Sequence, residues 1–93
     1  MSSYSSDQQV ANATADAQMV PRTQRARLTG IQADGASGSK IIFKSGGAAG
    51  TAIATFEFGS EGIDFYVPGS GILFEEGIYL DLTATPSVTI TFT

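Results

Sequence analysis

Apolar and polar residues alternate with a period of two along most of the chain after Arg25. The last run, 87–93, sets Val88, Ile90 and Phe92 against intervening threonines. Alternation of this kind is typical of strands that bury one face. Seven apolar-rich runs bounded by turn residues predict strands over 25–31, 40–44, 52–58, 62–68, 71–74, 78–83 and 87–93.

The spacing of these runs indicates the fold class. Turn residues recur roughly every eight to twelve positions, which is typical of a sandwich or barrel, and no segment after Pro21 has the period of a helix. We therefore expect an all-β fold, a small antiparallel β-sandwich of about seven strands over residues 22–93, jelly-roll or immunoglobulin-like. Its predicted inward set is Leu28, Phe43, Phe56 or Phe58, Phe65, Leu80, Ile90 and Phe92.

Residues 1–21 differ from the rest of the chain, being rich in Ser, Gln and Ala and poor in large apolar groups. Such a segment buries too little apolar surface to offset the entropy of ordering it. We expect an extended N-terminal arm over 1–21 that crosses to an adjacent subunit, anchored by Tyr4, Val10 and Met19. A short helix over 7–18 and an unstructured tail are the alternatives.

Length and composition limit how the domain is stabilised. The chain has 93 residues, no Cys and no His, so disulfides and zinc sites are excluded. A domain this small buries a modest share of its surface, and assembly is the remaining help. With no apolar run of about 18 residues and no signal-peptide pattern, we expect a protein made in a cytoplasm, with no membrane partner.

Charge is unevenly distributed along the chain. Residues 22–44 hold every cation and one acid, Asp34, so they carry +5 −1 = +4, whereas residues 45–93 hold six acids and no base and carry −6. One interpretation is chance clustering on solvated strands; the other is a molecule with a basic and an acidic end that docks head to tail or on a charged lattice. The acidic total, −4, and the lack of aromatics among the cations predict no nucleic-acid partner.

Two adjacent carboxylates, Glu75 and Glu76, are the first candidates for chemistry. The stretch F-E-E-G-I around them matches a three-residue hairpin loop, in which the last residue adopts the left-handed region that glycine occupies cheaply. We predict a positive φ at Gly77 and two exposed glutamates at a turn, not a catalytic pair.

Other candidate sites lack essential groups. The commonest general bases and nucleophiles, His and Cys, are absent. Glu61 and Asp64 flank Gly62 but supply too few oxygens for a calcium cage. The glycine-rich stretches GASGSK and KSGGAAG do not place a lysine at the end of a phosphate loop that leads into a helix. We predict a non-enzymatic protein with no catalytic, metal or cofactor-binding residues.

Four stretches carry a family resemblance: the opening RARLTGI, IIFKSGGAAGT, the block VPGSGILFEEGIYLDLT and the closing Val-Thr-Ile-Thr strand. Through them, residues 22–93 resemble small virion proteins of short-tailed phages that infect marine bacteria. The resemblance implies a capsid decoration or cement protein, assembled in the host cytoplasm and located in the virion. The implied partners are the major capsid protein or other virion proteins and copies of itself, such as a trimer; a neck or tail position is the alternative.

A host-surface-binding module, adhesin or lectin-like, is the competing interpretation. Carbohydrate recognition uses exposed aromatic rings, which are expected at loop tips. Tyr66 and Tyr79 are the outward aromatic candidates in the predicted strands, and both lie in mid-strand.

Overall fold

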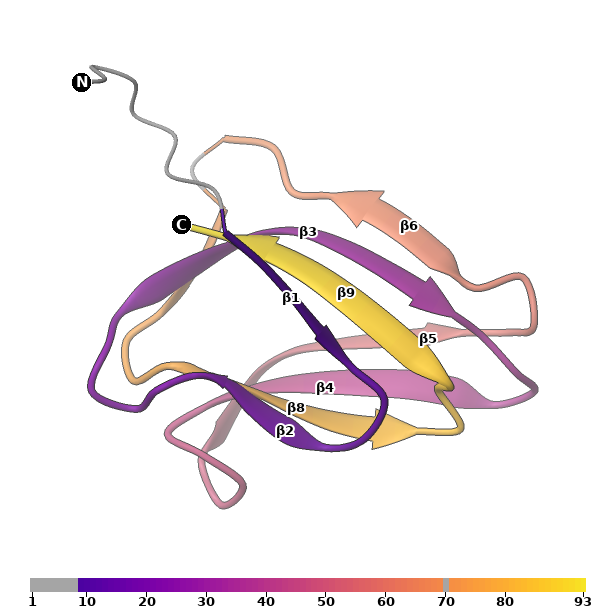
Figure 1. Ribbon diagram of the computed structural model, residues 1–93, viewed down its shortest axis with the longest axis horizontal. Coiled ribbons are helices and arrows are strands. Elements are labelled where there is room, and N and C mark those ends of the chain that lie inside the picture. The colour runs from indigo at the N-terminus through magenta and orange to yellow at the C-terminus, as the bar shows by residue number, and fades with distance from the viewer. Residues whose placement is uncertain (1–8, 70) are drawn as a thin grey trace.

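The molecule consists of two β-sheets that face one another (Figure 1). The computed structural model describes residues 9–69 and 71–93. In this part of the chain, no helix is long and apolar enough to cross a membrane. Its strands are β1 (Gln9–Ala13), β2 (Ala17–Val20), β3 (Ala26–Asp34), β4 (Ser39–Ser45), β5 (Thr51–Phe58), β6 (Ile63–Tyr66), β7 (Ile72–Phe74), β8 (Ile78–Thr83) and β9 (Ser87–Phe92).

The strands pair in the order of a jelly roll. Sheet A has the order β1-β9-β3-β6, with β7 also on β3, and sheet B has the order β2-β8-β4-β5. β6 pairs with residues 30–33 of β3 and β7 with residues 26–28, so the two follow each other along one edge of β3 and act as one interrupted strand. The chain then pairs from its ends inward, β1 with β9, β2 with β8, β3 with β6 and β7, and β4 with β5. This nesting is the double Greek key of a jelly roll.

The core fills the space between the two sheets. Because alternate residues of each strand point inward, every central strand contributes large apolar side chains to it. Burying each of these side chains stabilises the fold by about 1.5–3 kcal/mol. The residues with no exposed surface are Leu28, Ile41, Phe43, Phe74, Ile78, Leu80, Val88 and Ile90.

The sequence prediction of the sandwich is confirmed, and so are all seven predicted strands, within a residue or two at most ends. Of the predicted inward set, Leu28, Phe43, Leu80, Ile90 and Phe92 are buried.

The sequence left open whether Phe56 or Phe58 points inward, and in the structure both do. They lie half-buried on the inner face of β5 and pack against the core. The register with β4 shifts between Phe43 and Lys44, where Ile53 is the extra residue without a partner. Ala54 lies opposite the inward residue Phe43, so by alternation its neighbour Ile53 points outward, and Ile53 is 42% exposed.

Phe65 points inward as predicted, because it lies opposite buried Ile31 in register, but it is 40% exposed and so is not part of the buried core. Phe65 lies on β6, the last strand of sheet A on that side, across from β5, the last strand of sheet B. Its ring contacts that of Phe56, with centroids 5.5 Å apart. The side chain therefore lies at the rim of the core.

The expected separate arm is wrong for the described residues 9–20, as is the alternative of a helix over 7–18. β1 pairs with β9 and β2 with β8 of the same chain. Backbone hydrogen bonds supply the ordering that large side chains do not, and the small residues fit at the sandwich edge. Ala13 and Val20 are buried there.

The three residues predicted to anchor the arm lie in different environments. Met19 is partly buried and packs against the chain's own core. Val10 points outward from sheet A and is 67% exposed. Tyr4 lies outside the described residues.

Candidate functional site

The outer face of sheet A gathers side chains from segments far apart in the sequence. Strand register places Val10, Thr91, Gly30 and Tyr66 in one row across β1, β9, β3 and β6. The row beside it contains Asn12, Thr89, Gln32 and Asp64. The threonines of β9 contribute to this face because they alternate with buried apolar residues, so the threonine hydroxyls point away from the core.

Gly30 lies in the middle of this face, where its missing side chain leaves room for Thr91. A Cβ atom at this position would lie 2.6 Å from Oγ1 of Thr91, so the hydroxyl occupies the space that a side chain would need. Tyr66 is next to Gly30 in register and is 72% exposed. Together they border a groove of about 200 Å³ between β6 and β9.

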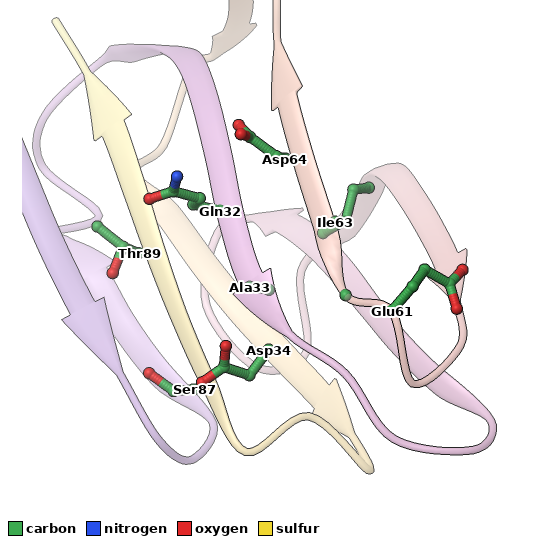
Figure 2. Close-up of a pocket in the computed structure, with 9 residues that line it drawn as sticks. Gln32, Ala33, Asp34, Glu61, Ile63, Asp64, Ser87 and Thr89 are labelled. Atoms are coloured by element: carbon green, nitrogen blue, oxygen red, sulfur yellow. The ribbon is translucent and has the colours of Figure 1, made fainter.

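A second, larger hollow of about 390 Å³ continues the groove toward the β5–β6 turn. Figure 2 shows side chains of β3, β6 and β9 around it, with Gln32 and Asp34 on β3 and Thr89 and Ser87 on β9. The two hollows share Gln32, Asp64 and Thr89. The face therefore forms a trough that is polar in its larger hollow and more apolar beside the exposed ring of Tyr66.

Acidic groups dominate one end of this trough. Asp34, Glu61 and Asp64 line the larger hollow, and no Lys or Arg lines it. Glu61 and Asp64, which the sequence analysis considered for calcium, both line this hollow, but their carboxylates point in different directions (Figure 2). Across the described residues, however, no three His, Cys, Asp or Glu residues form a group that could hold a metal ion. The acidic end would attract a basic partner surface.

Asn12 fixes β1 to this face. Its Nδ2 atom donates to the carbonyl of Val88 and to Oγ1 of Thr89, both at 2.9 Å, and to Oγ of Ser87 at 3.3 Å. These bonds orient the Thr89 hydroxyl and continue the β1–β9 contact through a side chain. Asn12 therefore holds the side of the trough that Ser87 and Thr89 form.

The glutamates of the β7–β8 turn lie elsewhere. Glu75 and Glu76 are exposed at the turn, and Gly77 has a φ of 79° as predicted. The backbone N–H of Glu76 donates to Oγ of Ser45 at 2.9 Å, so the turn is tied to the end of β4. This confirms the predicted corner.

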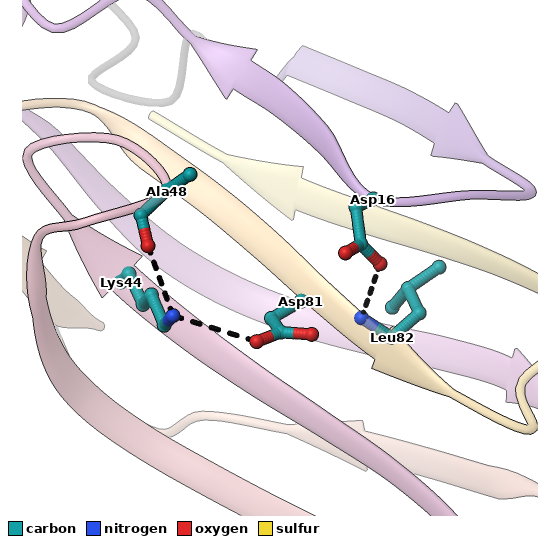
Figure 3. A network of polar contacts seen from close by, with 5 residues as sticks. All are labelled: Asp16, Lys44, Ala48, Asp81 and Leu82. Atoms are coloured by element: carbon teal, nitrogen blue, oxygen red, sulfur yellow. Dashed lines mark hydrogen bonds and ion pairs between the residues drawn. The ribbon is translucent and has the colours of Figure 1, made fainter.

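The outer face of sheet B pairs its charges. Lys44 Nζ lies 3.4 Å from Oδ2 of Asp81 and donates to the carbonyl of Ala48 at 3.0 Å (Figure 3). Lys40 is opposite Glu57 in register. The basic and acidic halves of the sequence thus meet across adjacent strands, and for these lysines they do not form separate ends.

The two tyrosines considered for ligand contact differ in environment. Tyr79 is half-buried on β8, between Gln18 of β2 and Lys44 of β4. Tyr66 is on an edge strand and exposed. Sequence reasoning placed both rings outward, but it missed the polar rows beside Tyr66. The alternation of 87–93 was the available signal, and the pairing register that assembles the rows is not readable from the sequence.

Comparison of the chain with protein families, with curated proteins and with solved structures finds no match.

Proposed function

We propose that the protein is a non-enzymatic structural protein of a phage virion, a capsid decoration or cement protein that binds the mature head lattice through the outer face of sheet A. The sequence resemblance of residues 22–93 to small virion proteins supports this function. The jelly roll is compatible with it, since viral capsid domains use this fold, although the same fold serves many other functions.

The exposed row across sheet A is the observation that carries the proposal. Val10 and Tyr66 are 67% and 72% exposed at its two ends, with Thr91 and Gly30 between them. Protein interfaces commonly combine a few aromatic anchors with polar groups around them. The row has this composition, with an exposed aromatic ring at one end and Thr91 in its middle.

Binding of this kind acts by mass action. A protein that binds the mature lattice but not its earlier or disrupted forms stabilises the mature state, by about 2.7 kcal/mol per site at a free concentration one hundred times Kd. The acidic end of the trough (Asp34, Glu61 and Asp64) predicts that the receiving surface is basic.

The first test is the copy number of this chain in purified virions, measured by quantitative mass spectrometry. A decoration protein is present in proportion to the head lattice. A few copies per virion would move the protein to the neck or tail, and its absence from virions would refute the proposal.

The second test removes the Tyr66 ring. Tyr66→Ala should weaken retention on purified heads by about 2–4 kcal/mol if this ring is an interface hot spot. Tyr79→Ala is the matched control, because it removes the same ring from the outer face of sheet B. Thermal unfolding of both variants separates loss of binding from loss of fold. Equal retention of the two variants would exclude this face as the docking surface.

A second candidate function, saccharide binding at a host surface, is favoured by Tyr66 and its neighbours. An exposed ring can stack on the apolar face of a sugar, while Gln32, Asp64 and Thr89 offer hydrogen-bonding groups beside it. Binding of the purified protein to a panel of immobilised glycans, lost in Tyr66→Ala and kept in Tyr79→Ala, would support this function.

A further inference from the structure

β5 is the longest edge strand of the described sandwich. It has eight residues, whereas the edge strands β1, β2, β6 and β7 have five, four, four and three. Its sequence, TAIATFEF, contains no Lys, Arg or Pro. Natural proteins usually protect edges with such residues, because a free edge strand pairs readily with another chain. Among the described residues, β5 pairs with β4 alone.

The core also reaches the surface at this edge. The ring of Phe56 packs edge-on against buried Phe43, with centroids 5.7 Å apart, and it also contacts Phe65. Phe56 and Phe58 are half-buried, and Phe65 is 40% exposed. Aromatic surface therefore continues from the middle of the core to the open side of the sandwich, next to the outer side of β5, which has no strand partner among the described residues.

We propose that β5 pairs with β5 of a second copy of this chain, antiparallel, about a two-fold axis at Phe56. A two-fold interface brings the same patch of both copies together, so it must be self-complementary. The regular part of β5 after the bulge, residues 54–58, meets this requirement. It places Ala54 of each copy opposite Phe58 of the other, and Phe56 opposite its equivalent, on the inner face.

The same register keeps the acidic side chains of the two copies apart on the outer face. Thr55 of each copy lies opposite Glu57 of the other, so the acidic side chains of the strand do not face one another. This matters because the chain has a net charge of −4, and like charges directly opposite in a sheet are destabilising. The pairing covers the aromatic edge and also gives hydrogen-bond partners to the backbone groups on the outer side of β5.

The antiparallel pairing determines how the two copies are oriented relative to each other. Opposed residues of antiparallel strands point to the same side of the sheet, so the axis is perpendicular to sheet B. The four strands of sheet B in each copy then form one continuous sheet, and both copies of sheet A lie on the same side of it. The pairing itself does not depend on the proposed function. Should that function hold, the dimer would present two docking faces in one direction and bind with avidity.

The first experiment uses opposite charges at one exposed position. By light scattering after gel filtration, the full-length protein should have twice the mass of one chain. Thr55→Glu places a carboxylate opposite Glu57 of the second copy and should raise the dimer dissociation constant by at least about tenfold. Thr55→Lys places a cation there and should leave it equal or lower. Gln32→Glu, on the outer face of sheet A, is the charge-matched control and should remain dimeric.

The outcomes are distinct. A full-length protein that stays monomeric at its highest soluble concentration overturns the proposal. Dimers that weaken equally with Glu and Lys at position 55 would also overturn it, because that result indicates a partner surface without this register. Circular dichroism and thermal unfolding check that each variant is folded, so that a monomer is not a misfolded one.

The second experiment tests the register with disulfides, using the absence of native cysteine. Directly opposite residues have Cα atoms about 4.5–5.5 Å apart, within the usual span of a disulfide. Thr55→Cys mixed with Glu57→Cys should cross-link under mild oxidation to twice the chain mass. Each variant alone should cross-link much less, since its cysteines lie diagonally at about 7–8 Å. Equal cross-linking in all three samples would overturn the register.

Discussion

The two long edges of the sandwich are closed in different ways. At the edge formed by β1 and β2, polar side chains continue the backbone ladder. Asp16 Oδ1 accepts a hydrogen bond from the backbone N–H of Leu82 at 2.8 Å (Figure 3), and Gln18 Nε2 donates to the carbonyl of Val20 at the same distance. At the edge formed by β5 and β6, aromatic rings fill the gap, and the outer side of β5 has no strand partner within the described residues.

The two edges show that the ordering of a segment does not depend on its hydrophobicity alone. The N-terminal segment has few large apolar residues, yet side-chain caps and ladder hydrogen bonds fix it to the chain's own sheets. β5 is more apolar and has a better strand sequence, and it is held by its ladder with β4 without the side-chain caps of the N-terminal segment. A segment with little apolar surface can therefore complete a fold, while a strongly apolar strand is left available for a partner.

Deleting residues 1–20 should have the largest effect, because it removes both strands of the closed edge. Buried Ala13 and Val20 would be lost, and Val88 and Ile78, which are fully buried on β9 and β8, would lie on uncovered strands. We expect a loss of stability above about 5 kcal/mol, the lower limit for whole domains, and thus no cooperative thermal unfolding.

Deletion of residues 1–8 is the control, since it removes no described strand and should unfold cooperatively. Cooperative unfolding of the longer deletion near the temperature of the full-length protein would show that the closed edge is dispensable. It would also return residues 9–20 to the role of a separate arm.

The sequence predicted the sandwich well and its edges poorly. Alternation identifies each strand and its inward side when a strand pairs on both edges, as with Leu80 and Ile90. It does not specify which strands are terminal. Phe65 has the same pattern as a core residue, but its strand is at the rim. Residues 9–20 have small side chains whose ordering depends on backbone and side-chain hydrogen bonds to strands about 60–80 residues later, which no local pattern encodes.

The candidate site could not be predicted from the sequence either, because it also depends on which strands pair and in what register. Tyr66, Gln32, Thr89 and Asn12 come from four strands, and register alone brings them into adjacent rows. Each is an ordinary polar or aromatic residue on the solvent side of a strand. The role of Gly30 cannot be predicted locally either, because the sequence does not show that the Thr91 hydroxyl lies above this glycine.

Asn12→Ala tests the closed edge with an intermediate effect. The change removes the donor of bonds to Val88 and Thr89, each worth about 0.5–1.5 kcal/mol. Since Asn12 is exposed, water replaces part of the loss, and we expect destabilisation of about 1–2 kcal/mol in denaturant unfolding. Thr55→Ala on β5 is the comparison and should change the stability of the monomer by less than about 0.5 kcal/mol. Similar losses at the two positions would contradict the difference between the edges.

The smallest effect should follow from removing the charges of the β7–β8 turn, which abuts the closed edge. Glu75 and Glu76 are exposed, and the turn is ordered by the backbone N–H of Glu76 on Ser45 and by the left-handed Gly77. Glu75→Gln with Glu76→Gln keeps that backbone and should shift stability by less than about 0.5 kcal/mol. Gly77→Ala is the contrasting change, because its Cβ would lie 2.4 Å from the carbonyl oxygen of Val20 at the end of β2 and should destabilise by more than about 1 kcal/mol. Denaturant unfolding of both variants measures the contrast. A double glutamine variant that folds normally but loses binding to heads would give these carboxylates a functional role and place part of the interface at this turn.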